Sequence, residues 1–289
     1  MKIGLFVPCY VDALYPEVGV STLRLLRSIG LDVDYPERQT CCGQPMGNAG
    51  FEYMARPLAK KFDELFRGYD YVVAPSASCA AYVRCFHPNL LGKAPLSSPR
   101  GDTIAPTTDS KTIEAPSGAV GGAFTSGAVG GAFTSGAVGG ACAAGKTVDL
   151  VEFLHDIIQV KSLPARFPHK VSVHNSCHGV RELGLSSPSE RNIPKFNKII
   201  DLLKLVEGIE VAEPERPDEC CGFGGMFAVE EKAVSARMGL EKVRRHIDTG
   251  AEYVTGPDSS CLMHMQGIAQ KQGLGIKFIH IAQILSSGL

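Results

Sequence analysis

One cysteine pattern is present twice in this chain of 289 residues. In each half, a short β-rich run ends in a cysteine, a Pro-Glu-Arg segment leads into Cys-Cys-Gly, and a further β-rich run precedes another cysteine. The matching segments are IGLFVPC and VSVHNSC, LDVDYPERQTCCG and IEVAEPERPDECCG, and YDYVVAPSASC and AEYVTGPDSSC. The first cysteine set is Cys9, Cys41, Cys42 and Cys79, and the second cysteine set is Cys177, Cys220, Cys221 and Cys261. An internal repeat of this kind indicates a duplicated structural unit.

Helical patterns lie between the β-rich runs. Residues 16–29 open with Pro16, and their apolar residues recur at near-helical spacing from Val20 onward. Residues 51–66 and 228–248 have similar patterns. The alternation predicts an α/β fold with two pseudo-symmetric duplicated domains, each built on a mainly parallel sheet with crossover helices. Because ligands collect at the carboxyl ends of parallel strands, both cysteine sets are predicted to line ligand sites.

A low-complexity segment interrupts the first half. It contains three nine-residue units rich in glycine and alanine, which have few side chains to bury. Cys142 in the third unit is predicted to be an incidental thiol. The predicted organisation is a first domain at residues 1–92 and 146–160, an inserted surface loop at residues 93–145, and a second domain at residues 161–289.

Composition excludes several classes of protein. The formal net charge of −1 gives no basic face for nucleic acid. The first apolar run ends at Pro8, too early for a signal peptide or a transmembrane segment, so we expect a cytoplasmic protein. Ten cysteines in a reducing compartment then indicate metal ligation or redox chemistry rather than disulfide bonds.

Thiolates are soft ligands that bind zinc, copper(I) or iron–sulfur clusters. Structural zinc sites commonly use C-x-x-C pairs, and neither half contains one. Ligands from three separate strand ends suit a bulkier group, so the spacing favours a cluster, while zinc in one half stays open. The glycines of CCGFGG, together with Gly43 and Gly47, are expected to let backbone N–H groups approach cluster sulfurs.

Three further side chains are assigned from their positions. His264 lies three residues after Cys261 and is an additional candidate ligand, because histidine ligates iron in some two-iron centres. His178 is expected to line the pocket beside Cys177. Cys85 has no counterpart in the second half and is expected to be a buried core thiol.

The doubled Cys, Cys-Cys-Gly, Cys pattern resembles the cysteine-rich CCG domain of iron–sulfur proteins. This domain is found in the cysteine-rich subunit of heterodisulfide reductase, in the iron–sulfur subunit of glycolate oxidase and in lactate utilisation protein A. The segments PSASCAAYV and PDSSCLMHM resemble the last of these most, and only residues 93–145 fall outside the resemblance. It implies one or two clusters of the 4Fe-4S type held by the eight cysteines of the two sets. It also implies oxidation of L-lactate to pyruvate together with a ferredoxin-like iron–sulfur subunit and a small companion subunit.

The chain departs from these relatives in ways that leave alternatives open. Heterodisulfide reductase domains close the motif with C-x-x-C, whereas Tyr82 and His264 occupy that place here. No ferredoxin-type cysteine run precedes the repeats, so electrons must be exchanged with another subunit, and no catalytic residue is assigned. A redox-silent zinc protein with a structural or assembly role is one alternative. A reductase-type subunit that acts on heterodisulfides or other disulfides through the Cys-Cys pairs is another.

Overall fold

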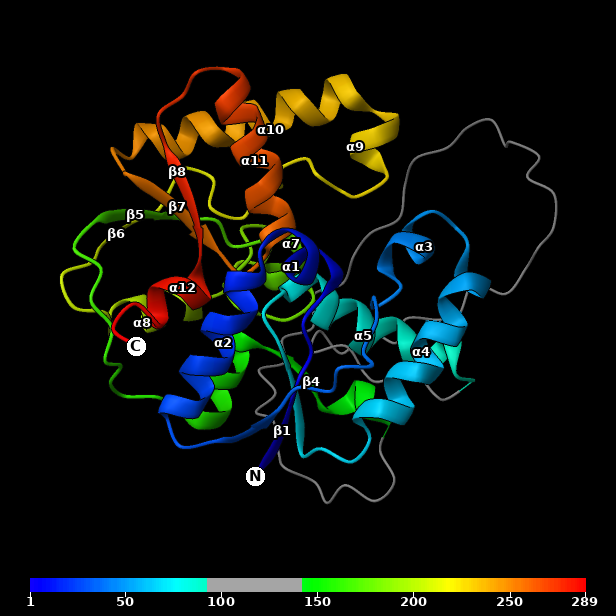
Figure 1. Cartoon of the computed structure of the whole chain (residues 1–289). Coiled ribbons are helices and arrows are strands. Elements are labelled where there is room, and N and C mark those ends of the chain that lie inside the picture. The colour runs from blue at the N-terminus through cyan, green and yellow to red at the C-terminus, as the bar shows by residue number, and fades with distance from the viewer. Residues whose placement is uncertain (93–141) are drawn as a thin grey trace.

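The computed structural model describes residues 1–92 and 142–289, which form two four-stranded parallel sheets flanked by helices (Figure 1). The first sheet has the strand order β2-β1-β3-β4, and the second has the equivalent order β6-β5-β7-β8. The strands are β1 (Lys2–Leu5), β2 (Asp32–Asp34), β3 (Tyr71–Ala74), β4 (Thr147–Asp149), β5 (Lys170–Val173), β6 (Glu210–Ala212), β7 (Tyr253–Gly256) and β8 (Lys277–His280). All strand pairs are parallel. The predicted α/β class and its internal duplication are confirmed.

Helices connect the strands in both halves. In the first half they are α1 (Cys9–Leu14), α2 (Pro16–Ser28), α3 (Gln44–Asn48), α4 (Glu52–Phe66), α5 (Ala77–Leu90), η1 (Ala143–Lys146), α6 (Leu150–Glu152) and η2 (Phe153–Ile158). In the second half they are α7 (Cys177–Arg181), α8 (Lys198–Leu203), α9 (Phe227–Glu230), α10 (Lys232–Asp248), α11 (Ser259–Lys271) and α12 (Ile281–Leu285). Within the described ranges, no helix combines the length and apolar composition needed to cross a membrane.

The helix predicted at residues 16–29 is observed as α2. Proline occupies its first turn, where the missing N–H costs no hydrogen bond. The buried face consists of Val18, Thr22, Leu25 and Leu26, whereas Val20 is 47% exposed. The helix α2 packs against both α1 and α12.

Each half ends in a strand and a short helix that packs on the other half. α12 follows β8 of the second sheet but contacts α2, and the two helices lie side by side in Figure 1. Reciprocally, α6 and η2 follow β4 of the first sheet and contact α8. Phe153 and Leu154 of η2 belong to the same buried cluster as Ile281 and Leu285 of α12. The exchange therefore places residues of both halves in one buried cluster, where each large apolar side chain contributes about 2 kcal/mol.

The predicted inserted loop falls mostly at residues 93–141, which lie outside the described residues. Its last positions pack as part of the first half. Cys142 is half-buried, Ala143 and Ala144 are buried, and the Ala143 N–H donates to Asp63 Oδ1 at 2.8 Å. The other domain boundaries stay a prediction.

Candidate metal centre

The cysteines of both sets lie beyond the carboxyl ends of the parallel strands. Cys9 and Cys177 begin α1 and α7, and Cys79 and Cys261 lie in the first turns of α5 and α11. The two Cys-Cys pairs lie in the loops that follow β2 and β6. Because the strands of each sheet are parallel, their carboxyl ends lie at the same end of the sheet. The four cysteines of each set therefore come together there.

The two sets face one cavity of about 230 Å³ between the halves. Seven of the eight cysteines line it: Cys9, Cys42, Cys79, Cys177, Cys220, Cys221 and Cys261. His178 lies in the wall as predicted, and its Nε2 is 3.4 Å from Gln44 Nε2. Cys41 is not part of the wall, but its Sγ lies 3.6 Å from Cys9 Sγ.

The first cysteine set consists of two close pairs of sulfurs. Besides the pair of Cys9 and Cys41, Cys42 Sγ lies 3.5 Å from Cys79 Sγ, and both of these cysteines are buried. Hydrogen bonds from Cys42 and Cys9, together with the N–H of Gly43 at 3.4 Å, lower the pKa of Cys41. The same hydrogen bond between Cys9 and Cys41 raises the pKa of Cys9. The pKa of Cys41 is thus lowered and that of Cys9 raised by the hydrogen bond between them.

The second cysteine set has the same arrangement. Hydrogen bonds from Cys177 and Cys221 lower the pKa of Cys220, and the N–H of Gly222 donates to Cys220 Sγ at 3.3 Å. The hydrogen bond with Cys220 raises the pKa of Cys221, which is buried beside Cys261. In both halves, therefore, the pKa of the first cysteine of the Cys-Cys pair is lowered and that of the second is raised.

The loop after each Cys-Cys pair depends on glycine. Gly43 and Gly222 have φ angles of 92° and 85°, in the left-handed region that glycine adopts without steric cost. A Cβ atom on Gly222 would lie 2.7 Å from both Met238 Cβ and Ser235 O. As expected for glycines that let the backbone approach sulfur, the N–H groups of Gly43 and Gly222 contact Cys41 and Cys220.

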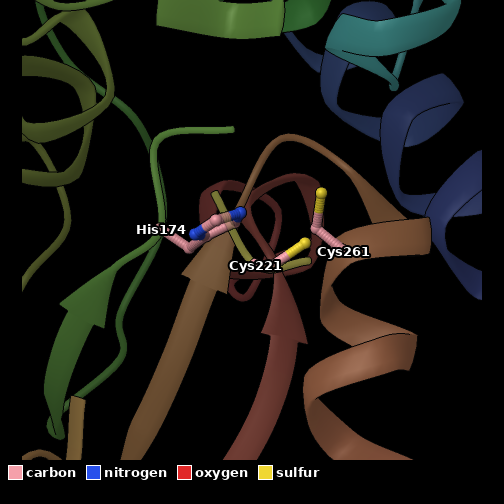
Figure 2. Close-up of side chains that lie close together, drawn as sticks. All are labelled: His174, Cys221 and Cys261. Carbon is pink, nitrogen blue, oxygen red and sulfur yellow. The ribbon is translucent and has the colours of Figure 1, made fainter. Parts of the chain in front are cut away.

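His174 lies beside Cys221 and Cys261 of the second set and was not among the site residues predicted from the sequence. This residue directly follows β5 and is buried. One ligand atom of each of His174, Cys221 and Cys261 lies within 4.8 Å of the other two, and Figure 2 shows the imidazole extending towards the two sulfurs. Neither ring nitrogen has a hydrogen-bond partner among the described residues. The signal was present in the repeat, because His174 stands where IGLFVPC has Phe6.

His264, the candidate ligand predicted from the sequence, has different neighbours. Its Nε2 lies 3.4 Å from Ser235 O and 3.5 Å from Ser235 Oγ, and its ring is 5.8 Å from that of Phe223. Burial lowers the pKa of His264. The group of potential metal ligands in the described part of the chain contains His174 rather than His264. Ligation by His264 stays a prediction.

Asp258 connects the two halves beside the cavity, and the sequence analysis also missed this residue. Its buried carboxylate accepts hydrogen bonds from the hydroxyls of Ser76 and Ser78, both at 2.8 Å, and from the N–H of Ser78 at 3.1 Å. On the other side it accepts a hydrogen bond from Ser176, next to Cys177. One carboxylate therefore fixes the start of α5 in the first half against the second cysteine set.

Comparisons with known proteins agree with this architecture. Residues 3–84 and 171–266 each match the model of the CCG cysteine-rich domain, and the matches contain all eight cysteines of the two sets. Lactate utilization protein A 1 of Bacillus mycoides is 33% identical over 286 residues, covering 99% of this chain and 97% of that protein. Lactate utilization protein A of Halalkalibacterium halodurans is 34% identical over 286 residues, with the same coverage of 99% and 97%. The chain therefore belongs to the lactate utilization protein A family of CCG cysteine-rich domain proteins.

Proposed function

We propose that this chain is the iron–sulfur subunit of a cytoplasmic complex that oxidises L-lactate to pyruvate. In this proposal each cysteine set holds one cluster of the 4Fe-4S type. The observation that carries the proposal is the pair of four-cysteine sets on one cavity between the halves. The lactate substrate is inferred from the names of the relatives.

The donors of each set suit an anionic cluster. All eight are soft sulfur ligands, and the inner cysteines Cys42, Cys79, Cys221 and Cys261 are buried away from water. The N–H groups of Gly43 and Gly222 point at sulfur atoms, which offsets negative charge on the ligands. When bound, the clusters would supply centres that exchange single electrons.

The proposed reaction requires partner proteins that accept electrons. Converting L-lactate to pyruvate releases two electrons and two protons. We propose that a ferredoxin-like iron–sulfur subunit receives the electrons, and that a small companion subunit completes the complex. Of the predicted pocket residues, His178 lies in the cavity wall.

Zinc is the second candidate, because one geometric observation favours it. Two thiolates on one tetrahedral zinc ion lie about 3.8 Å apart, since a Zn–S bond is about 2.3 Å long. The sulfur separations of 3.6 Å in the pair of Cys9 and Cys41 and 3.5 Å in the pair of Cys42 and Cys79 are close to that value. A zinc-loaded chain would be a redox-silent structural or assembly protein. The close pairs are also the arrangement that a thiol–disulfide reductase would need.

Anaerobic purification followed by metal analysis separates these functions. We expect a brown protein with about four iron and four sulfide per set, whose absorption is bleached by dithionite. Cys42→Ser and Cys221→Ser should each remove about half of the iron, whereas Cys142→Ser, outside both sets, should retain all of it. A colourless protein with stoichiometric zinc in both halves would contradict the proposal. A metal-free protein that reduces disulfides would support the reductase.

A further inference from the structure

The layer of side chains beneath the cysteines differs sharply between the two halves. In the duplicated β-strands, His174 takes the position of Phe6. In the long helices, the buried residues have the same spacing, so that Lys242 and His246 of α10 correspond to Phe62 and Phe66 of α4. Three phenylalanines of the first half are thus replaced by three basic side chains in the second.

In the first half this layer is a closed aromatic cluster. The ring of Phe6 lies 5.1 Å from that of Phe62 and 5.9 Å from that of Phe66, and Phe62 and Phe66 are 4.7 Å apart. All three side chains are buried. They contact each other and offer no polar atom to the first cysteine set.

In the second half two of the three basic side chains have polar partners. The ammonium group of Lys242 donates to Arg216 O at 2.7 Å, and His246 Nδ1 lies 2.8 Å from Ser172 Oγ. His174 has no such partner at either ring nitrogen within the described ranges, although it is only 1% exposed. Burying an imidazole without a hydrogen bond costs free energy. A metal ion bound to one ring nitrogen would offset this cost.

The backbone fixes the direction of the imidazole. The His174 N–H donates to Thr255 O of β7 at 2.7 Å. Gly256 permits this close approach, because a Cβ there would lie 2.5 Å from His174 O. The side chain consequently extends towards Cys221 and Cys261, with ligand atoms within 4.8 Å of one another (Figure 2).

We propose that His174 is a nitrogen ligand of the metal centre held by the second cysteine set. The first centre then has sulfur ligands from the protein alone, and the second is a mixed nitrogen–sulfur centre. The inference rests on the proposed function in so far as the metal is iron.

The test uses wild-type protein loaded with iron and labelled with ¹⁵N-histidine. Pulsed electron paramagnetic resonance of the reduced protein should show the hyperfine coupling of a directly bound histidine nitrogen, with the ¹⁵N pattern replacing the ¹⁴N pattern. His174→Phe should abolish this coupling and retain the iron of the first set. Phe6 occupies the equivalent position in the first half, and circular dichroism checks that the variant folds. His246→Gln is the matched control and should retain the coupling.

Two results separate this inference from the proposed function. Iron-loaded protein without histidine coupling, or with coupling that survives His174→Phe, would overturn the ligand assignment and leave the cluster proposal standing. If the protein binds zinc instead of iron, the cluster proposal fails. X-ray absorption of the zinc form should then be measured on the Cys42→Ser variant, in which the first set lacks one ligand and the signal comes mainly from the second. It should show a nitrogen at about 2.0–2.1 Å beside sulfurs at about 2.3 Å. An all-sulfur zinc site, or no bound metal at all, would overturn the assignment of His174.

Discussion

The carboxylate of Asp258 in the second half accepts hydrogen bonds from both the hydroxyl and the N–H of Ser78 in the first half. Hydrogen bonds to a charged group contribute about 1.5–3 kcal/mol each, and leaving a buried donor unpaired costs a similar amount. Asp258→Asn replaces one acceptor oxygen with a donor and is expected to lower the free energy of unfolding by about 3 kcal/mol. Urea unfolding measures this loss. Asp32→Asn, on an exposed position of β2, is the control and should change it little.

Gly222→Ala should destabilise the chain more than a glycine replacement at a similar φ angle elsewhere. At Gly222 the alanine would meet both an unfavourable φ and a collision with Met238 and Ser235, for a total of about 3 kcal/mol. Gly30 has a φ of 81° and nothing within 4 Å of the place where a Cβ would stand, so Gly30→Ala should cost only about 1 kcal/mol. Thermal unfolding checks the difference. Equal losses would show that the loop after Cys221 tolerates a side chain.

Acid should destabilise the protein partly through His280. Burial lowers the pKa of His280 to about 4, and its Nδ1 accepts a hydrogen bond from the Ala282 N–H, which only the neutral ring can do. Between about pH 6.5 and pH 4 the unfolded chain binds a proton that the folded chain does not. Stability is therefore complete above about pH 6.5 and falls as the pH is lowered through this window, by at most about 3 kcal/mol from this residue.

The variant His280→Gln isolates this contribution. Urea unfolding at pH 7, 6 and 5 should give a weaker pH dependence for the variant than for the wild-type protein at equal metal content. An unchanged pH dependence would assign the acid sensitivity to the other buried histidines. His87 and His246 also have pKa values lowered by burial.

The exchange of closing helices predicts cooperative unfolding of both halves. Leu285 of α12 is fully buried in the cluster that includes Leu25 and Leu26 of α2. Leu285→Ala should lower the free energy of unfolding by about 2–5 kcal/mol and keep a single transition. Leu289→Ala, at an exposed position, should be neutral. Two separate transitions in the Leu285→Ala variant would show that the halves fold independently.

The sequence predicted the positions of the cysteines well because two local rules agree there. The repeat identified equivalent residues, and parallel sheets place the residues after each strand at one edge. Cys9 and Cys79, seventy residues apart, could be assigned to one set on that basis. The exposure of Val20 could not be predicted, because the buried face of an amphipathic helix depends on both of its neighbours, and the contact of α2 with α12 comes from the far end of the chain.

His174 and Asp258 could not be found in the same way. A histidine after an apolar strand and an aspartate before a helix are both common in surface loops, and each stands at a position of the repeat where the two halves carry different residues. Their roles depend on the register of β5 with β7 and on the contact between α5 and the second half. A comparison of the two halves for the positions that differ would have selected His174, because a phenylalanine stands at its equivalent.

The reciprocal packing of α12 on α2 and of η2 on α8 has a consequence for a chain that is cut. A protease that cleaves between Gln159 and Leu163 would cut the peptide chain that joins the two halves. Each fragment would nevertheless carry the helix that covers the apolar face of the other. The nicked protein should therefore elute as one particle of intact size, with the cavity between the fragments preserved, until a denaturant releases them.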